Sequence, residues 1–291
     1  MKKWLSVLLL STLVLVLAAC GAKDDSNEEA NTGSNTESDN GTTETAEPTK
    51  LVIGASYGLH DIILEQAKPI LAEQGVEIEV RPYQEYVMPN QDLDSGELDA
   101  NYFQTIPYFE NEMKEKGYDF ANAGGIHIEP IGVYSQKYKS LDELPDGATV
   151  IISNSVTEQG RILTLFESLG LITLKEGVVK SEARLEDIVD NPKNLNIDAN
   201  SAPEMLVTYY NNGEGDVVVI NSNFAIDAGI SPINDSIAIE SSDSPYVNII
   251  ATRSGDENNE AIQKLVEVLL SKEIQDFILK EWDGAVVPVE K

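Results

Sequence analysis

From Lys50 onward, short apolar runs alternate with amphipathic stretches along the chain. Residues 51–54 form an apolar run that predicts a strand, and residues 60–74 place their apolar side chains on one helical face. Residues 76–81 then predict a second strand. Strands and helices in alternation are typical of a mainly parallel sheet covered by helices. The pattern therefore predicts an α/β fold for this part of the chain.

The alternation continues to the end of the chain. One of the later elements is an apolar run over residues 126–134, which predicts a single uninterrupted strand. The other expected elements are residues 89–95, 99–103, 106–116, 149–153, 156–169, 185–189, 195–197, 202–210, 216–220, 223–228, 246–252, 259–270 and 272–282.

The N-terminal residues have the layout of a secretory signal. A short basic start precedes an apolar run over residues 5–17, which is too short for a membrane span of ~20 residues. Leu-Ala-Ala-Cys follows at residues 17–20 and resembles a bacterial lipobox, which implies cleavage before Cys20 and lipid attachment to its sulfur. We therefore predict a lipoprotein signal peptide at residues 1–19 and a mature protein anchored by lipid to the extracytoplasmic face of the cell membrane.

The segment after the signal is polar and acidic. It has no aromatic or large apolar residue, so it cannot bury enough surface to offset the entropy of ordering. Acidic residues far outnumber the single base, Lys23, and their repulsion extends the segment. We predict that residues 20–49 are the lipidated Cys20 followed by a disordered tether.

Composition removes several classes of function. With 20 Lys and Arg against 50 Asp and Glu, the formal net charge is −30, so nucleic acid is not an expected partner. One Cys excludes an internal disulfide, and two His argue against a His-rich metal site. We expect neither a metal nor a cofactor.

Ligands of open α/β sheets bind beyond the carboxyl ends of the strands, and this rule selects candidate site residues. The selected positions are Tyr57, Tyr83, Tyr86, residues 103–105, residues 154–161 and residues 221–223. The earlier ones supply aromatic rings, whereas the later ones supply Asn, Thr and Arg161. A guanidinium can grip a carboxylate with two parallel hydrogen bonds. An apolar wall facing a polar, cationic wall suits a zwitterion with an apolar side chain.

Five blocks of sequence carry a resemblance to a known family. They are Tyr-Val-Met-Pro-Asn at 86–90, Gly-Glu-Leu-Asp-Ala-Asn-Tyr-Phe-Gln at 96–104, Ser-Leu-Asp-Glu-Leu at 140–144, Asn-Pro-Lys-Asn-Leu at 191–195 and Ser-Pro-Tyr-Val-Asn at 244–248. From about Lys50 to its end, the chain resembles the NlpA-type, methionine-binding lipoproteins of ABC importers.

The resemblance implies a two-lobed, periplasmic-binding-protein-like fold of type II. Each lobe would be a mixed sheet flanked by helices, and hinge strands would join the lobes. Lobe I would comprise residues 50–133 plus 244–291, and lobe II residues 134–243. It implies a monomeric receptor, not an enzyme, that closes over an amino acid and delivers it to an ABC permease with a cytoplasmic ATPase.

The resemblance also assigns roles to individual residues. Tyr86 and Phe103 would line the ligand side chain. Asn154 and Arg161 would hold the carboxylate, and Asn221 would face the polar end of the amino acid.

Two positions depart from the family pattern. Thr105, included in the predicted site, stands where many relatives have His, and Glu158 stands where many have Asn. Because of these departures, the ligand is open among methionine, its D-isomer, a related amino acid and a methionine-containing dipeptide.

Two other classes of function stay open. Gly-Ala-Ser-Tyr-Gly at residues 54–58 matches the nucleophile-elbow pattern of serine hydrolases, with His60 and His127 as the available bases. A lipoprotein adhesin is the second class, and it would have no small-molecule pocket.

Overall fold

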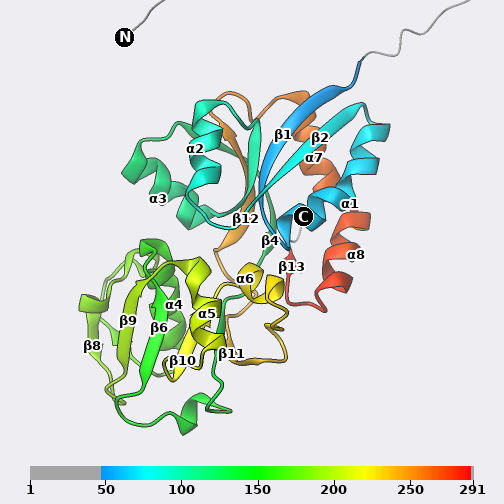
Figure 1. The fold of residues 1–291 in the computed structure, drawn as a ribbon. Helices are drawn as coiled ribbons and strands as arrows, with labels where there is room; N and C mark the ends of the chain where they lie inside the picture. The colour runs from blue at the N-terminus through cyan, green and yellow to red at the C-terminus, as the bar shows by residue number, and fades with distance from the viewer. Residues whose placement is uncertain (1–46, 290–291) are drawn as a thin grey trace, which may run out of the picture. The chain divides into compact units, whose positions relative to one another are not determined.

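The structure, a computed structural model, describes residues 47–289. The predicted signal peptide, Cys20 and nearly all of the predicted tether lie outside the described residues. Main-chain hydrogen bonds join the strands into a six-stranded sheet, a five-stranded sheet and a small two-stranded sheet (Figure 1).

The six-stranded sheet has the order β13-β4-β12-β3-β1-β2. Its strands are β1 (Thr49–Ser56), β2 (Val76–Tyr83), β3 (Ala100–Thr105), β4 (Phe120–Ile128), β12 (Val247–Arg253) and β13 (Val287–Pro288). β1 pairs in parallel with β2 and β3, whereas β12 runs antiparallel to β3 and β4. The sheet is therefore mixed.

Helices cover both faces of this sheet. They are α1 (His60–Glu73), α2 (Met88–Ser95), α3 (Ile106–Lys116), α7 (Glu260–Leu269) and α8 (Lys272–Glu281). Figure 1 shows α1, α7 and α8 on one face and α2 and α3 on the other. The buried side chains of Ile53, Leu64 and Leu265 belong to the core on the first face, and those of Leu93 and Phe109 to the core on the second.

The five-stranded sheet has the order β11-β5-β10-β6-β9. Its strands are β5 (Gly132–Tyr134), β6 (Thr149–Ser153), β9 (Asn196–Ser201), β10 (Val217–Ile220) and β11 (Ser236–Ile239). β6 pairs in parallel with β9 and β10, and β5 runs antiparallel to β10 and β11. Its α-helices are α4 (Val156–Ser168), α5 (Leu206–Asn211) and α6 (Ser222–Asp227).

Short elements complete this half of the molecule. β7 (Thr173–Leu174) and β8 (Ile188–Asp190) form the two-stranded sheet, and the 3-10 turns are η1 (Leu141–Glu143), η2 (Lys180–Glu182), η3 (Leu185–Asp187) and η4 (Pro203–Met205). A separate core with Ile152, Leu163 and Val219 lies within this half. The predicted α/β fold with helix-flanked mixed sheets is confirmed.

The predicted single strand over residues 126–134 is wrong. The run ends in β4 at Ile128 and resumes in β5 at Gly132, because Pro130 has no backbone N–H for a sheet ladder. β4 pairs with β12 in the first sheet, whereas β5 pairs with β10 and β11 in the second. Residues 129–131 therefore carry the chain from one sheet to the other.

A second segment, residues 240–246, carries the chain back from β11 to β12. The Glu240 backbone N–H donates to the Ile131 carbonyl at 3.0 Å, and the Ile131 N–H donates to the Glu240 carboxylate at 3.3 Å. The two crossing segments, residues 129–131 and 240–246, are thus hydrogen-bonded to each other between the sheets.

Sequence patterning missed part of the first sheet. The beginning of β4, residues 120–125, is Phe-Ala-Asn-Ala-Gly-Gly, which has no apolar alternation. A Cβ atom on Gly124 would lie 2.6 Å from Val266 of α7, so a small residue lets this helix approach the strand. The short strands β11 and β13 were also missed.

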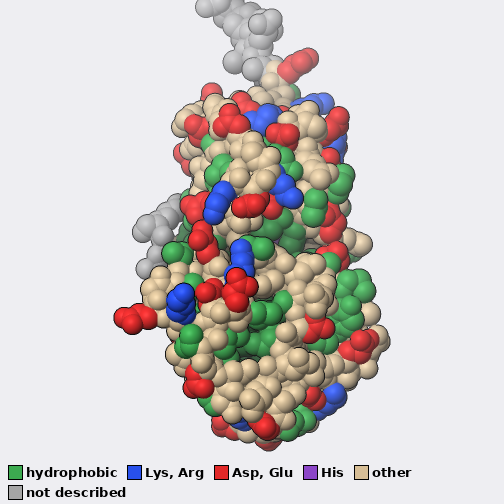
Figure 2. Space-filling model, turned by 90° about the vertical axis from the view of Figure 1, so that its left-hand side faces the viewer, with side chains coloured by type: hydrophobic (Ala, Val, Ile, Leu, Met, Phe, Trp, Pro, Cys, Tyr) green, Lys and Arg blue, Asp and Glu red, His purple; other side chains and the backbone are tan. Residues whose placement is uncertain are grey.

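Within residues 47–289, no helix combines the length and apolarity required to cross a bilayer. On the face shown in Figure 2, acidic and basic side chains are interspersed rather than gathered into one basic patch.

Candidate functional site

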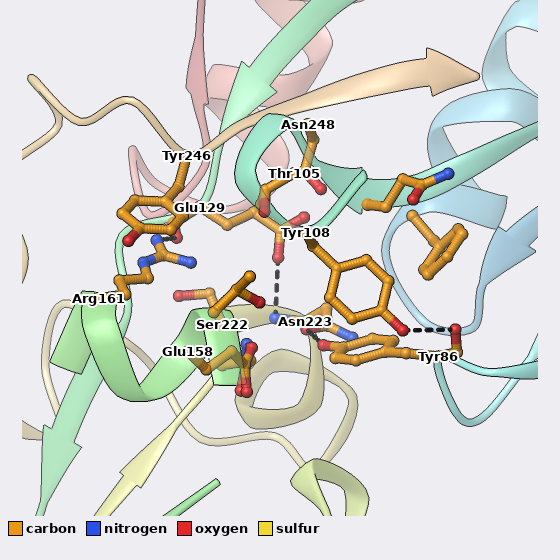
Figure 3. A pocket seen from close by; sticks show the side chains of 14 residues that line it. Tyr86, Thr105, Tyr108, Glu129, Glu158, Arg161, Ser222, Asn223, Tyr246 and Asn248 are labelled. Atoms are coloured by element: carbon orange, nitrogen blue, oxygen red, sulfur yellow. Dashed lines mark hydrogen bonds between the residues drawn. The ribbon is translucent and has the colours of Figure 1, made fainter. Parts of the chain in front are cut away.

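A cavity of about 480 Å³, counted with the open space at its mouth, lies beside the two crossing segments. Both halves of the described chain contribute to its walls (Figure 3). The lining residues are Tyr86, Phe103, Gln104, Thr105, Tyr108, Glu129, Thr157, Glu158, Arg161, Asn221, Ser222, Asn223, Tyr246 and Asn248.

The structure brings five of the six predicted ligand-binding residues to this cavity. They are Tyr86, Phe103, Thr105, Arg161 and Asn221.

The sixth predicted residue, Asn154, lies elsewhere. Its side chain is exposed and lines a neighbouring groove, which shares Tyr86 and Tyr108 with the cavity. Tyr57 and Tyr83, which also follow predicted strands, do not line the cavity either. Tyr57 is 46% exposed, and the Tyr83 hydroxyl donates to Asp92 at 2.5 Å.

Aromatic rings form one wall of the cavity. The ring centroid of Tyr86 lies 5.9 Å from that of Phe103 and 6.2 Å from that of Tyr108. Tyr108 donates its hydroxyl to the Tyr86 carbonyl at 3.1 Å, and Tyr86 donates its own to Asn223 Oδ1 at 2.7 Å. Tyr108 was not among the predicted residues. Its position in the first turn of α3, directly after β3, is the signal that could have identified it.

Arg161 is buried and connects both crossing segments. Its Nε donates to the two Glu240 carboxylate oxygens at 3.2 and 3.0 Å, and Nη2 donates to Glu240 and, at 2.6 Å, to the Glu129 carbonyl. The guanidinium carbon lies 4.5 Å from the Tyr246 ring centroid. Among the described residues, Nη1 has no hydrogen-bond partner.

The prediction that one wall of the cavity carries a net positive charge is wrong. Glu240 matches the charge of Arg161 directly, and Glu129 and Glu158 also line the cavity. Glu240 lies 79 residues from Arg161 in sequence, so no local pattern reveals this partner. The cavity therefore contains one guanidinium nitrogen available to a ligand, in surroundings with several carboxylates.

Glu129 is held in place by two buried histidines. Its Oε1 lies 2.8 Å from His127 Nε2 and 3.1 Å from His60 Nε2. A carboxylate only accepts hydrogen bonds, so His127 Nε2 carries a proton, and Nδ1 of a neutral ring then accepts from the Tyr102 hydroxyl at 2.5 Å. Oε2 of Glu129 accepts the Asn223 backbone N–H at 3.1 Å, drawn in Figure 3.

Burial lowers the pKa of His60 to about 4, because a charged imidazole is poorly solvated there. Burial by itself would raise the pKa of Glu129, but His60 and the His127 hydrogen bond bring this pKa below its ordinary value. Within residues 47–289, these three side chains are the one group close enough to hold a metal ion. Their candidate ligand atoms already contact one another, and the result is a fixed Glu129 carboxylate at the cavity.

Glu158 lies in the first turn of α4, one turn before Arg161. Its Oε1 accepts a hydrogen bond from Asn221 Nδ2, whereas Oε2 has no partner. Burial raises the pKa of this carboxyl, against the opposing effects of Ser153, Asn221 and Arg161.

A glycine positions α4 against its neighbour. A Cβ atom on Gly160 would lie 2.5 Å from the Ser181 carbonyl oxygen in η2, so this turn can reach α4 only at a residue without a side chain. The contact fixes the part of the helix that carries Glu158 and Arg161.

The nucleophile-elbow pattern does not form a nucleophile–base pair. Ser56 is buried at the end of β1, and its Oγ has no hydrogen-bond partner among the described residues. The His60 Nε2 atom instead faces Glu129 and Asn248 Oδ1. The hydrogen bond that activates a serine nucleophile is thus not made here.

The chain is similar to known binding lipoproteins. Residues 51–290 match the family model described as NlpA lipoprotein. The chain is 46% identical over 293 residues to the methionine-binding lipoprotein MetQ of Bacillus subtilis (strain 168), and the match covers 100% of both.

Two solved structures are similar over most of the chain. A pheromone cOB1 precursor/lipoprotein of the YaeC family from Enterococcus faecalis V583 is 54% identical with a TM-score of 0.80, covering 83% of this chain and 100% of that one. A nutrient binding protein from Burkholderia cenocepacia bound to methionine is 37% identical with a TM-score of 0.79, covering 82% of this chain and 100% of that one.

Proposed function

The chain belongs to the NlpA lipoprotein family, and on that premise we propose that it is the solute-binding lipoprotein of an ABC importer. Its ligand is methionine, a closely related amino acid or a methionine-containing dipeptide. The names of the similar proteins support a methionine-like ligand. Those names describe binding proteins, which supports a receptor rather than a hydrolase or an adhesin.

The observation that carries the proposal is the pairing of an aromatic wall with one unoccupied guanidinium nitrogen in a single cavity. The rings of Tyr86, Phe103 and Tyr108 offer the apolar, polarisable contact that a thioether prefers. Nη1 of Arg161 offers a charge-assisted hydrogen bond to a carboxylate. Thr105 and Asn221 add polar contacts at the lining.

We propose that the ligand bridges two lobes, which follow the predicted division into residues 50–133 plus 244–291 and residues 134–243, except that Gly132 and Val133 pair within the second sheet and so belong to the second lobe. The two crossing segments form the hinge between them. Closure is a population shift, because ligand contacts with both walls exist only when the walls meet. The hydrogen bond from Tyr86 to Asn223 supports this mechanism, since it joins residues 137 positions apart across the cavity.

The lipid anchor belongs to the same proposal. Diacylated Cys20 holds the receptor on the extracytoplasmic face of the membrane, next to its permease. In a Cys20→Ala variant the protein should leave the membrane fraction and appear in the soluble fraction. Retention of the variant in the membrane fraction would contradict the anchor.

Ligand identity is tested directly by binding. The ligand-free protein should show a thermal shift with L-methionine, D-methionine or methionine dipeptides and none with aspartate. Ligand at 100 times its Kd adds ~2.7 kcal/mol of stability. Mass spectrometry of the small molecules released by denaturing the freshly purified protein should identify the same compound. No shift with any methionine compound, and no such compound released, would refute the proposed ligand class.

A further inference from the structure

Two buried acceptor atoms at the cavity have no hydrogen-bond partner. They are Oε2 of Glu158 and Oδ1 of Asn221. Both residues line the cavity, and both are buried. A buried polar atom without a partner costs roughly 1–3 kcal/mol, and more when it is charged. Two such atoms in one place call for a donor that the protein itself does not supply.

The orientation of the Asn221 amide follows from its neighbour. An ionised carboxylate only accepts hydrogen bonds, so the Asn221 Nδ2 group must be the end that faces Glu158 Oε1. The amide oxygen is then the free end. Glu158 Oε2 and Asn221 Oδ1 are therefore the two acceptor atoms that remain for a donor on the ligand.

The charges around the cavity single out Glu158. Arg161 is matched by Glu240, and Glu129 receives hydrogen bonds from His127 and from the Asn223 backbone. Glu158, in contrast, accepts a hydrogen bond from Asn221 and lies near the Ser153 hydroxyl, and both of these groups are neutral. Among the carboxylates that line this cavity, Glu158 is the one with an oxygen, Oε2, that receives no hydrogen bond from the described residues.

From this arrangement we propose that Glu158 recognises the ammonium group of the ligand. The inference rests on the proposed function. Glu158 and Arg161 are three positions apart on α4, which places both side chains on the same helical face. One turn of helix therefore presents an anion for the ammonium and the Nη1 donor for the carboxylate of the same amino acid. The cavity selects ligands with a free primary ammonium and rejects apolar carboxylates without one.

The test is a comparison of two ligands and two variants by titration calorimetry on the refolded, ligand-free protein. The ligands are L-methionine and 4-(methylthio)butanoate, which is the same molecule without its amino group. The variants are Glu158→Gln, which keeps the shape and removes the charge, and Glu204→Gln. Glu204 is an exposed acid on η4 that acts on Glu158 electrostatically but does not line the cavity.

Glu158→Gln should weaken methionine binding by about 10- to 100-fold and leave the affinity for the deaminated ligand within about twofold. Glu204→Gln should change neither affinity by more than about twofold, because an exposed charge is well screened. Equal losses for both ligands in Glu158→Gln, or no loss for methionine, would overturn the role of Glu158 and leave the proposed function intact. Failure of the wild-type protein to bind methionine or its dipeptides would overturn both.

The ligand-free stability separates recognition from a structural role. Removing a buried, unpaired charge does not destabilise a fold, so the ligand-free Glu158→Gln variant should melt at or above the temperature of the wild type. A lower melting temperature together with weaker binding of both ligands would identify Glu158 as a structural residue and refute the proposal.

Discussion

Replacing Arg161 by Ala should destabilise the protein even when no ligand is present. The side chain is 4% exposed and holds the Glu240 carboxylate and the Glu129 carbonyl, one on each crossing segment. Its loss leaves a largely buried carboxylate without its counter-charge. Breaking a buried ion pair in this way typically costs about 3–5 kcal/mol.

The assay is urea unfolding of the ligand-free protein followed by circular dichroism, with thermal unfolding as a second measurement. For a domain of this size, each 1 kcal/mol shifts the melting temperature by roughly 2–4 °C, so a fall of about 6–20 °C is expected. Arg81→Ala is the matched control, since its ion pair with Glu79 is solvent-exposed and such pairs contribute little to stability.

A loss of stability in Arg161→Ala no larger than that in the Arg81 control would refute the reasoning. It would mean that Arg161 does not hold the crossing segments and serves the ligand alone. A double-mutant cycle with Glu240→Ala measures the coupling between the two charges, and a coupling near zero would have the same meaning.

Three further outcomes follow from the contacts. The free energy of unfolding should fall by about 3 kcal/mol as the pH is lowered from 6.5 to 4, because His60 has a pKa near 6.5 in the unfolded chain and of about 4 in the folded protein. Urea unfolding of His60→Gln should lack this pH dependence. An identical pH dependence in the variant would contradict the assignment. Tyr86→Phe should weaken ligand binding by about 0.5–1.5 kcal/mol in calorimetry through loss of the bond to Asn223, and unchanged affinity would argue against this contact in the closed form. Gly160→Ala should cost about 1–3 kcal/mol in thermal unfolding, because the added methyl would overlap the Ser181 carbonyl; an unchanged melting temperature would show that the turn can retreat.

Much of the fold was readable locally. The predicted bounds of α3 and β6 coincide with those observed, and α1, α4, α7 and α8 differ by one residue at their ends. Hydrophobic periodicity indicates which side of a helix or strand is buried, and it depends only on residues a few positions apart in the sequence. The order of strands within each sheet is not, because it depends on pairings between distant segments.

The candidate site shows the same difference between what the sequence predicts and what only the structure reveals. Strand-end reasoning and family resemblance together selected Tyr86, Phe103, Arg161 and Asn221, and these side chains do line one cavity. They did not reveal that Glu240 neutralises Arg161. Nor did they show that Glu158 is left with an unpartnered oxygen.

By itself, the sequence determined the alternation of strands and helices, the family and most of the side chains at the cavity. Only the tertiary structure decided that one apolar run would divide between two sheets at Pro130, and which carboxylate would pair with the buried guanidinium. The physical reason is that periodicity and propensity act over a few residues. Charge pairing and desolvation depend on whichever distant groups the fold brings within a few ångströms.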